Sequence, residues 1–232
     1  MSTYTEQRVA TAVRARGNTI RTLLELGGFI AGAVLVAFGV VAIFMGFNGR
    51  STVADSLKQE KIVGTADMTP ALIAKEASEA GLKGVDLPTV PVAGKAINSG
   101  PRARAFASYM RIHALEATGG LTYAQMPRFS TADGKGTNDP TQALKGSNGQ
   151  PVDNPIRSLW VTETALSTAL NVSYMAEQVA LFSIVVGFAL LLSGFGFAIL
   201  AIGGALRNPE TAFKFLSKRA SKPTGVTPVP TT

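Results

Sequence analysis

The sequence predicts an all-α membrane protein, in which two transmembrane helices flank an extracytoplasmic, mainly helical domain with a long flexible loop. Three observations favour this class. Two long runs, 26–47 and 179–206, contain no charged residue. The 232 residues are 46% hydrophobic and 16% charged, with a mean hydropathy of +0.23, which is a composition typical of membrane proteins. The net charge of +7 comes from basic residues beside the two runs, while the segment between them is nearly neutral.

The first apolar run has the length of a membrane-spanning helix. About 20 residues at a rise of about 1.5 Å each cross a hydrocarbon core of about 30 Å. A cleaved signal peptide has an apolar core of only about 7–15 residues, so we interpret this run as an uncleaved anchor and assign the span to 26–48. The second run, 179–206, is longer than the hydrocarbon core requires, so we expect it to tilt or to protrude.

Two spans place both termini on the same side of the membrane. The terminal segments carry four and five Lys or Arg residues near the spans, more than the intervening segment does. The positive-inside rule therefore predicts a bacterial plasma-membrane protein with cytoplasmic N and C termini and an extracytoplasmic domain over 49–178. The basic residues expected at the membrane surface are Arg8, Arg14, Arg16, Arg21, Arg207, Lys214, Lys218 and Arg219.

The segments outside the spans divide into a helix and a tail. Residues 1–25 alternate apolar residues and arginines at helical spacing, which predicts a basic amphipathic helix on the cytoplasmic membrane surface. Gly17-Asn18 is the expected bend between this helix and the first span; one straight helix that projects into the cytoplasm is the alternative. Residues 207–232 are expected to form a cytoplasmic basic tail.

Small residues recur every seven positions in both apolar runs. This spacing aligns a narrow stripe along a helix that crosses its neighbour at a small angle, and small side chains there let two backbones approach closely. We expect the stripes to face each other, or to face the same spans of a neighbouring copy; the alternative is that Gly and Ala are simply common in membrane helices. The stripes are Gly28, Gly32, Gly39 and Gly46 in the first run, and Ser173, Ala180, Gly187, Gly194 and Ala201 in the second.

Local signals predict three further helical stretches between the spans. Thr69 as N-cap, Pro70 at the first helical position and Gly81 as a stop predict a short helix. A second helix is expected over 101–118, with an apolar stripe at Ala103, Phe106, Met110, Ala114 and Ala117. Asp153 or Asn154 can cap a long helix that starts at Pro155 and continues into the second span.

The remaining segments between the spans are expected to be loops or a helical extension. Residues 51–62 can extend the first helix beyond its span. Residues 85–98 are too rich in proline for a central strand and are interpreted as an extended loop or an edge hairpin. Residues 130–153 are rich in Gly, Asn, Asp, Thr and Pro, which is typical of a mobile loop.

The sequence provides little for catalysis. It contains no cysteine and a single histidine, His113, whereas ordinary metal sites need several imidazoles or thiolates on converging elements. We therefore predict no catalytic, cofactor-binding or metal-binding residue. His113 is interpreted as a half-buried or surface histidine in preference to a pH-sensitive contact. Arg104 and Arg111 lie on one helix face without interleaved aromatic residues, which indicates a solvated face more than a contact with an anionic partner.

Three stretches resemble a family of actinobacterial two-span membrane proteins of unknown role. They are "TYTEQRVATAVRARGNTIRTLLELGGFIAGAVLVAFGVVAIFMGFNGRSTVADSLKQEKIVGT", "RAFASYMRIHALEATGGLTYAQM" and "WVTETALSTALN", followed after one position by "SYMAE". Members of that family often carry the label aromatic ring-opening dioxygenase. Extradiol ring-opening enzymes hold Fe(II) with two His and one carboxylate, and one histidine cannot supply that set. We interpret the label as mistaken, and the resemblance implies only a bacterial plasma-membrane setting.

These observations favour a protein that acts by binding. We expect a non-catalytic accessory subunit or self-associating scaffold of a plasma-membrane complex, whose partners are the lipid bilayer and another membrane protein or further copies of itself. A homo-oligomeric two-span channel and an extracytoplasmic sensor or binding module are the alternatives. Neither nucleic acid nor a small-molecule substrate is indicated, because the basic residues flank the spans and the acidic residues are scattered.

Overall fold

A computed structural model describes residues 2–202, with side chains described from residue 23 onward. This part of the chain forms four helices and, apart from isolated bridges, no strand, so the predicted all-helical class is confirmed. The helices are α1 (Ser2–Gln59), α2 (Pro70–Glu79), α3 (Gly100–Ala117) and α4 (Pro155–Ile202). Within the described residues the chain divides into two units: a helix pair, residues 2–44 with 183–202, and a lobe, residues 45–182.

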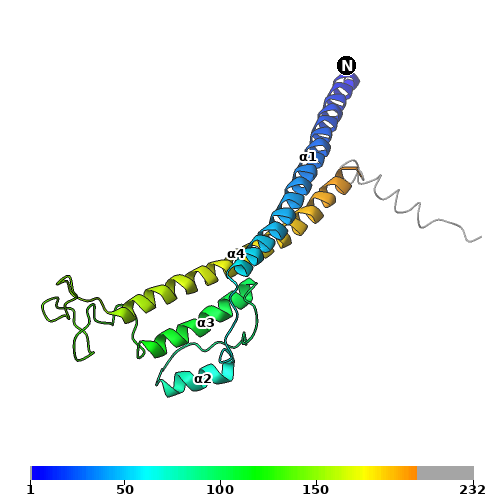
Figure 1. The fold of residues 1–232 in the computed structure, drawn as a ribbon. Helices are drawn as coiled ribbons and strands as arrows, with labels where there is room; N and C mark the ends of the chain where they lie inside the picture. The colour runs from blue at the N-terminus through cyan, green and yellow to red at the C-terminus, as the bar shows by residue number, and fades with distance from the viewer. Residues whose placement is uncertain (1, 203–232) are drawn as a thin grey trace, which may run out of the picture. The chain divides into compact units, whose positions relative to one another are not determined.

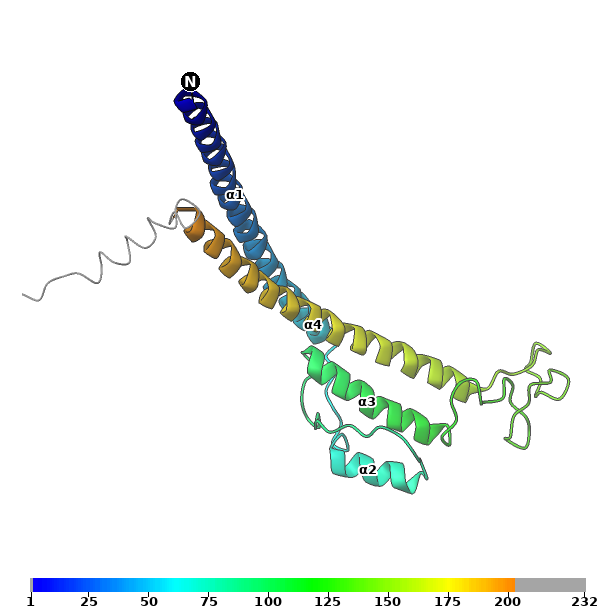
Figure 2. The same cartoon turned by 180° about the vertical axis from the view of Figure 1, so that it is seen from behind.

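Both long helices have the length and composition of membrane spans. The apolar windows of α1 and α4 have a mean hydropathy of 2.5, and only 11% and 17% of their residues are buried. A helix at the core of a soluble protein would be mostly buried, whereas a helix that faces lipid keeps its apolar side chains on the outside. Within the helix pair, α1 and α4 lie side by side in both views (Figures 1 and 2).

The helices continue beyond the apolar runs at both ends. α1 passes through Gly17 and Asn18 without a break in its helical backbone. Whether the part before the span lies on the membrane surface or projects into the cytoplasm stays a prediction. The expected extension of α1 after the span is confirmed as far as Gln59. The expected long helix from Pro155 into the second apolar run is also confirmed.

In the lobe, α3 lies between α2 and the first half of α4 (Figures 1 and 2). Because α3 has neighbours on two sides, it buries a second face besides the expected stripe. Tyr109 and Ile112 of this second face are fully buried, whereas Ala117 of the expected stripe is exposed and does not belong to the core. The largest fully buried side chains of the lobe are Tyr109, Ile73, Ile97, Ile112 and Val92.

The helix ends in the lobe follow their capping residues. The Thr69 hydroxyl accepts a hydrogen bond from the Leu72 amide at 3.4 Å, and the Asn154 side chain accepts one from the Ile156 amide at 3.1 Å. Each bond satisfies one of the amides that a helix leaves free at its N-terminus. Gly81, just after α2, has a φ of +68°, a left-handed conformation that favours glycine at a helix end.

The loops of the lobe are joined by backbone hydrogen bonds. Gly64 donates to the Lys95 carbonyl at 3.1 Å and accepts from Gly94 at 2.8 Å, so the expected extended segment 85–98 pairs with the loop after α1. Within 130–153, Ser130 donates to Val152 and Val152 donates to Leu144, at 2.9 and 2.8 Å. The mobility expected of 130–153 stays a prediction, but these bonds link residues from both ends of the segment.

Candidate functional site

Four glycines of the helix pair lie where the backbones of α1 and α4 approach each other closely. A Cβ atom built on Gly32 would lie 2.8 Å from the Gly194 carbonyl oxygen, and one built on Gly39 would lie 2.8 Å from the Gly187 carbonyl oxygen. Cβ atoms on Gly187 and Gly194 would meet backbone atoms of α1 at the same range. These four residues, which we call the glycine seam, therefore join the two helices of one chain through backbone contact.

The other small residues of the two stripes lie outside this closest contact. Gly28 and Ala201 are partly exposed members of the helix pair. In the lobe, Gly46 and Ala180 are buried, and Ser173 is partly buried and donates a hydrogen bond to the Ala169 carbonyl at 3.0 Å. A Cβ built on Gly49 would lie 3.3 Å from that of Ala180, which is tighter than an ordinary van der Waals contact but involves a side-chain atom and no backbone atom of α4.

The basic residues predicted at the membrane surface fall outside the described side chains. Arg8, Arg14, Arg16 and Arg21 belong to α1, but their side chains precede residue 23. Arg207, Lys214, Lys218 and Arg219 lie outside the described residues altogether.

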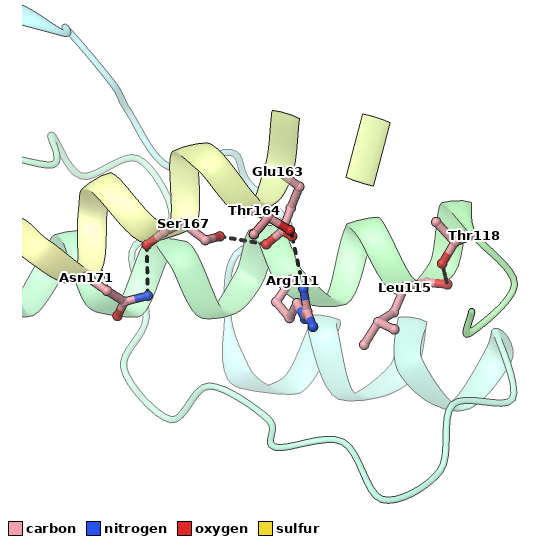
Figure 3. A network of polar contacts seen from close by, with 7 residues as sticks. All are labelled: Arg111, Leu115, Thr118, Glu163, Thr164, Ser167 and Asn171. Carbon is pink, nitrogen blue, oxygen red and sulfur yellow. Dashed lines mark hydrogen bonds and ion pairs between the residues drawn. The ribbon is translucent and has the colours of Figure 1, made fainter. Parts of the chain in front are cut away.

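A buried carboxylate joins α3 to α4 in the lobe (Figure 3). Glu163 of α4 is 4% exposed, and its Oε2 lies 3.2 Å from Nη1 of Arg111 on α3. Ser167, one turn further along α4, donates a hydrogen bond to Oε1 of Glu163 at 2.6 Å. The Arg111 guanidinium also lies over the Trp160 ring, 4.1 Å from its centre. A buried carboxylate is tolerated only when it is paired and hydrogen-bonded in this way.

This contact corrects the interpretation of the two arginines on α3. Arg111 pairs with Glu163 and stacks on Trp160, and the Arg104 guanidinium lies 4.8 Å from the centre of the Tyr174 ring. The aromatic residues are not interleaved with the arginines in the sequence because they belong to α4. Both arginines therefore pack against α4 instead of forming a purely solvated face.

An apolar groove lies between α3 and α4 beside this ion pair. Its volume is about 480 Å³, within the range of small-molecule pockets. Met110 and Ala114 line it from α3, and Leu159 and Leu166 line it from α4. His113, Thr162 and Glu163 also line it, so a predominantly apolar wall carries three polar residues.

His113 lies between two carboxylates from different parts of the lobe. Its Nδ1 is 2.7 Å from Oε1 of Glu76 on α2, and its Nε2 is 3.3 Å from Oδ2 of Asp67 in the loop before α2. The Nδ1 contact with Glu76 is a hydrogen bond, whereas the Nε2 contact with Asp67 is an ion pair only when the ring is protonated. The side chain is 26% exposed, which fits the predicted half-buried histidine.

We call His113, Asp67 and Glu76 the His113 cluster. Neighbouring side chains shift the pKa of two carboxyl groups here, that of Asp67 and that of Glu116, which contacts Glu76. A hydrogen bond from the Thr65 side chain lowers the pKa of Asp67, with a smaller contribution from the His113 charge. A hydrogen bond with Glu76 raises the pKa of Glu116, because two carboxyl groups in contact favour sharing one proton.

The cluster is also the one place in the described part of the chain where three potential metal ligands converge. Single ligand atoms of Asp67, Glu76 and His113 all lie within 4.8 Å of one another. Because the two carboxylates contact opposite nitrogens of the ring, one cation at either nitrogen would have to draw the other carboxylate away from its present contact. The arrangement is that of an imidazole between two carboxylates. No spacing motif in the sequence signals it, since the three residues come from three separate segments.

In comparisons with known proteins, no protein-family model, no curated protein and no solved structure matches this chain. The residues themselves therefore carry the functional argument.

Proposed function

We propose that the protein is a non-catalytic integral membrane protein that acts as an accessory subunit or self-associating scaffold of a plasma-membrane complex. In this proposal the helix pair crosses the bilayer and the lobe lies on its outer side, with both termini in the cytoplasm. The apolar lengths of α1 and α4 and the basic residues at both ends of the chain support this arrangement.

The glycine seam is the observation that carries the proposal. The seam connects the two spans of one chain, so each chain supplies a preformed helical hairpin whose outer faces are free for other contacts. Those faces carry large apolar side chains that are about half exposed or more, and the two apolar runs contain no ionisable residue. The exposed side chains include Phe29, Phe38, Phe44, Phe188, Phe195 and Leu192.

The same seam argues against the channel alternative. A pore lined by the small-residue stripes needs Gly32 and Gly39 to face a central lumen. In this chain, backbone atoms of α4 lie against both positions. A pore would then have to be lined by the bulky outer faces, on which apolar side chains predominate and Ser193 is the exposed polar residue of the described apolar runs.

The enzyme alternative finds little support in the lobe. The single histidine contacts Asp67 and Glu76, and its two nitrogens are 3.3 and 2.7 Å from them. Glu163 is paired with Arg111 and buried. A general base must reach a substrate proton, and an activated nucleophile needs a base beside it. The Ser167 hydroxyl lies beside Glu163, but that carboxylate is already paired with Arg111.

Co-purification from a mild detergent tests the proposal. Affinity-tagged protein from its native membrane should elute with a second membrane protein in fixed stoichiometry, or as a defined homo-oligomer in light scattering. A Phe38→Ala/Phe188→Ala double variant removes two exposed side chains from the outer faces and should weaken the assembly. Gly196→Ala, at a position with no atom within 4 Å of an added Cβ, is the matched control. A monomer without any partner would contradict the proposal.

A further inference from the structure

A polar cavity lies at the N-terminal end of α4, among the loops that precede the helix. Its volume is about 440 Å³, which suits a small molecule. Two arginines line it, Arg128 from the loop and Arg157 from the first turn of α4, together with Tyr123, Ser158 and Asp153. The cavity is separate from the His113 cluster and from the glycine seam.

Neither arginine of this cavity forms an ion pair with a described side chain. Among residues 23–202, Arg50 and Arg111 each form an ion pair with a glutamate, whereas no carboxylate lies within 4 Å of the guanidinium groups of Arg128 and Arg157. The Nε atom of Arg157 is buried and has no hydrogen-bond partner within the same part of the chain. The two arginines share the cavity with a single carboxylate, Asp153, so its lining carries a net positive charge that an anion would offset.

Aromatic rings hold both guanidinium groups in place. The Arg157 guanidinium lies 3.9 Å from the centre of the Tyr123 ring, and that of Arg128 lies 4.9 Å from the centre of the Phe129 ring. Stacking fixes the plane of a guanidinium and leaves the N–H groups at its edge available for an oxyanion. Such preorganisation reduces the entropy that binding has to overcome.

Hydrogen bonds tie the two arginines to one frame. The Asn154 amide donates to the Arg128 carbonyl at 2.9 Å, and the Asn154 side chain caps α4 just before Arg157. The Arg128 amide in turn donates to the Asn138 side chain at 2.9 Å. The loop that carries Arg128 is therefore fixed to the first turn of α4, which carries Arg157.

We propose that this cavity binds a small soluble oxyanion, namely a phosphate- or sulfate-bearing molecule. The two guanidinium groups match the paired oxygens of such an anion. The Asp153 carboxylate on the cavity wall favours a ligand that also carries an ammonium or hydroxyl group. A bare, highly charged anion would be repelled by that carboxylate.

The position of the cavity favours a soluble ligand over a lipid headgroup. Along α4, the apolar run begins at Val179, 22 positions after Arg157. At about 1.5 Å per residue, this distance is about 33 Å. This length of helix between the cavity and the apolar run favours a soluble ligand over a lipid phosphate.

Calorimetric titration of the purified full-length protein in nanodiscs tests this assignment. The probes are inorganic phosphate, sulfate and O-phosphoethanolamine, each compared with sodium chloride at equal ionic strength. We expect one site per chain, with O-phosphoethanolamine binding more tightly than phosphate. Arg128→Met and Arg157→Met should each weaken binding at least about tenfold, since each removes charge-assisted hydrogen bonds. Arg104→Met, which removes another arginine stacked on an aromatic ring, should leave binding unchanged.

Several outcomes would overturn the assignment. If sodium chloride gives the same binding heat as the oxyanions, the signal is an effect of ionic strength only. If wild type and Arg128→Met bind equally well, the anion binds elsewhere. Binding that appears only in nanodiscs containing anionic lipid would identify a headgroup as its source. Arg128 is exposed, so its variant is expected to fold, and the emission of Trp160, the one tryptophan of the chain, checks the fold of each variant. A failure to find this ligand would leave the co-purification result untouched.

Discussion

Arg50 of α1 and Glu177 of α4 form an ion pair just outside the two apolar runs, with Nη2 of Arg50 3.2 Å from Oε1 of Glu177. Arg50 is the first charged residue after the first run, and Glu177 is the last one before the second. The other carboxylate oxygen of Glu177 accepts a hydrogen bond from the Gly100 amide at the start of α3. One carboxylate thus connects three helices of the lobe.

This arrangement makes Glu177 more important for stability than Arg50. Glu177→Ala should lower the free energy of unfolding by about 1–3 kcal/mol, because it leaves the partly buried Gly100 amide without its acceptor. Arg50→Ala should lower it by less than about 1 kcal/mol, because the Arg50 side chain is 46% exposed and solvent screens the pair. Thermal unfolding in detergent measures both. Equal effects of the two variants would show that the ion pair, and not the amide contact, is what matters.

The glycine seam predicts opposite effects for two Gly→Ala changes in the helix pair. In Gly39→Ala, the new Cβ would lie 2.8 Å from the Gly187 carbonyl oxygen and 3.0 Å from the Leu191 amide nitrogen. Both are backbone atoms, so the helices must separate, at about 1–3 kcal/mol. In Gly196→Ala no atom lies within 4 Å, and alanine favours a helix by about 1 kcal/mol over glycine. Unfolding in detergent should thus be easier for the first variant and unchanged or harder for the second.

The raised pKa of Glu116 predicts a pH dependence of stability. A carboxyl group whose pKa is higher in the folded state retains its proton there while the unfolded chain has lost it. The contribution of Glu116 to the free energy of unfolding is fully present below its ordinary pKa of 4.5. It is lost as the pH rises through the raised pKa of the folded state. Glu116→Gln removes the charge but can still donate a hydrogen bond to Glu76. Near about pH 4 the variant should be as stable as wild type. Near about pH 7 its free energy of unfolding should be higher than that of wild type by less than about 1 kcal/mol, which thermal unfolding at the two pH values measures.

A neighbouring glutamate provides the control for this pH effect. Glu79→Gln removes a charge at the end of α2, where Glu79 pairs with Lys75 at 3.7 Å and belongs to no carboxyl pair. Its stability relative to wild type should not improve between about pH 4 and pH 7. If Glu116→Gln shows the same difference from wild type at both pH values, the interaction with Glu76 does not control the titration. Asp67 acts in the opposite direction, since its lowered pKa stabilises the fold above its ordinary range and this contribution disappears in acid.

The helices follow from the sequence because their signals are local. Thr69 and Pro70 mark the start of α2, and Asn154 and Pro155 mark that of α4, since a cap and a first-turn proline act within one turn of helix. Each apolar run is likewise a stretch of consecutive residues, so its length can be read from the sequence without knowledge of the fold. The small-residue spacing indicates which face of each helix can approach another, but it does not distinguish a partner in the same chain from one in a second copy.

The side-chain clusters could not be predicted, because they depend on how separate segments pack. His113 meets Glu76 only because α2 packs on α3, and no periodicity relates the two residues. Arg111 and Trp160 are 49 positions apart and meet through the packing of α3 on α4. The cavity with Arg128 and Arg157 depends further on the hydrogen bonds of an irregular loop, whose composition alone resembles that of a disordered segment.

The absence of cysteine from the chain makes its orientation in the membrane directly testable. A thiol introduced at Ala132, an exposed position in the loop of the lobe, should react with a membrane-impermeant maleimide in intact cells if the lobe is extracytoplasmic. A thiol at Ser2 should react only after the cells are permeabilised, because the positive-inside rule places the N-terminus in the cytoplasm. The wild-type chain supplies the background for both, since it has no thiol. Labelling of Ser2→Cys but not of Ala132→Cys in intact cells would reverse the orientation, and it would place the oxyanion cavity in the cytoplasm.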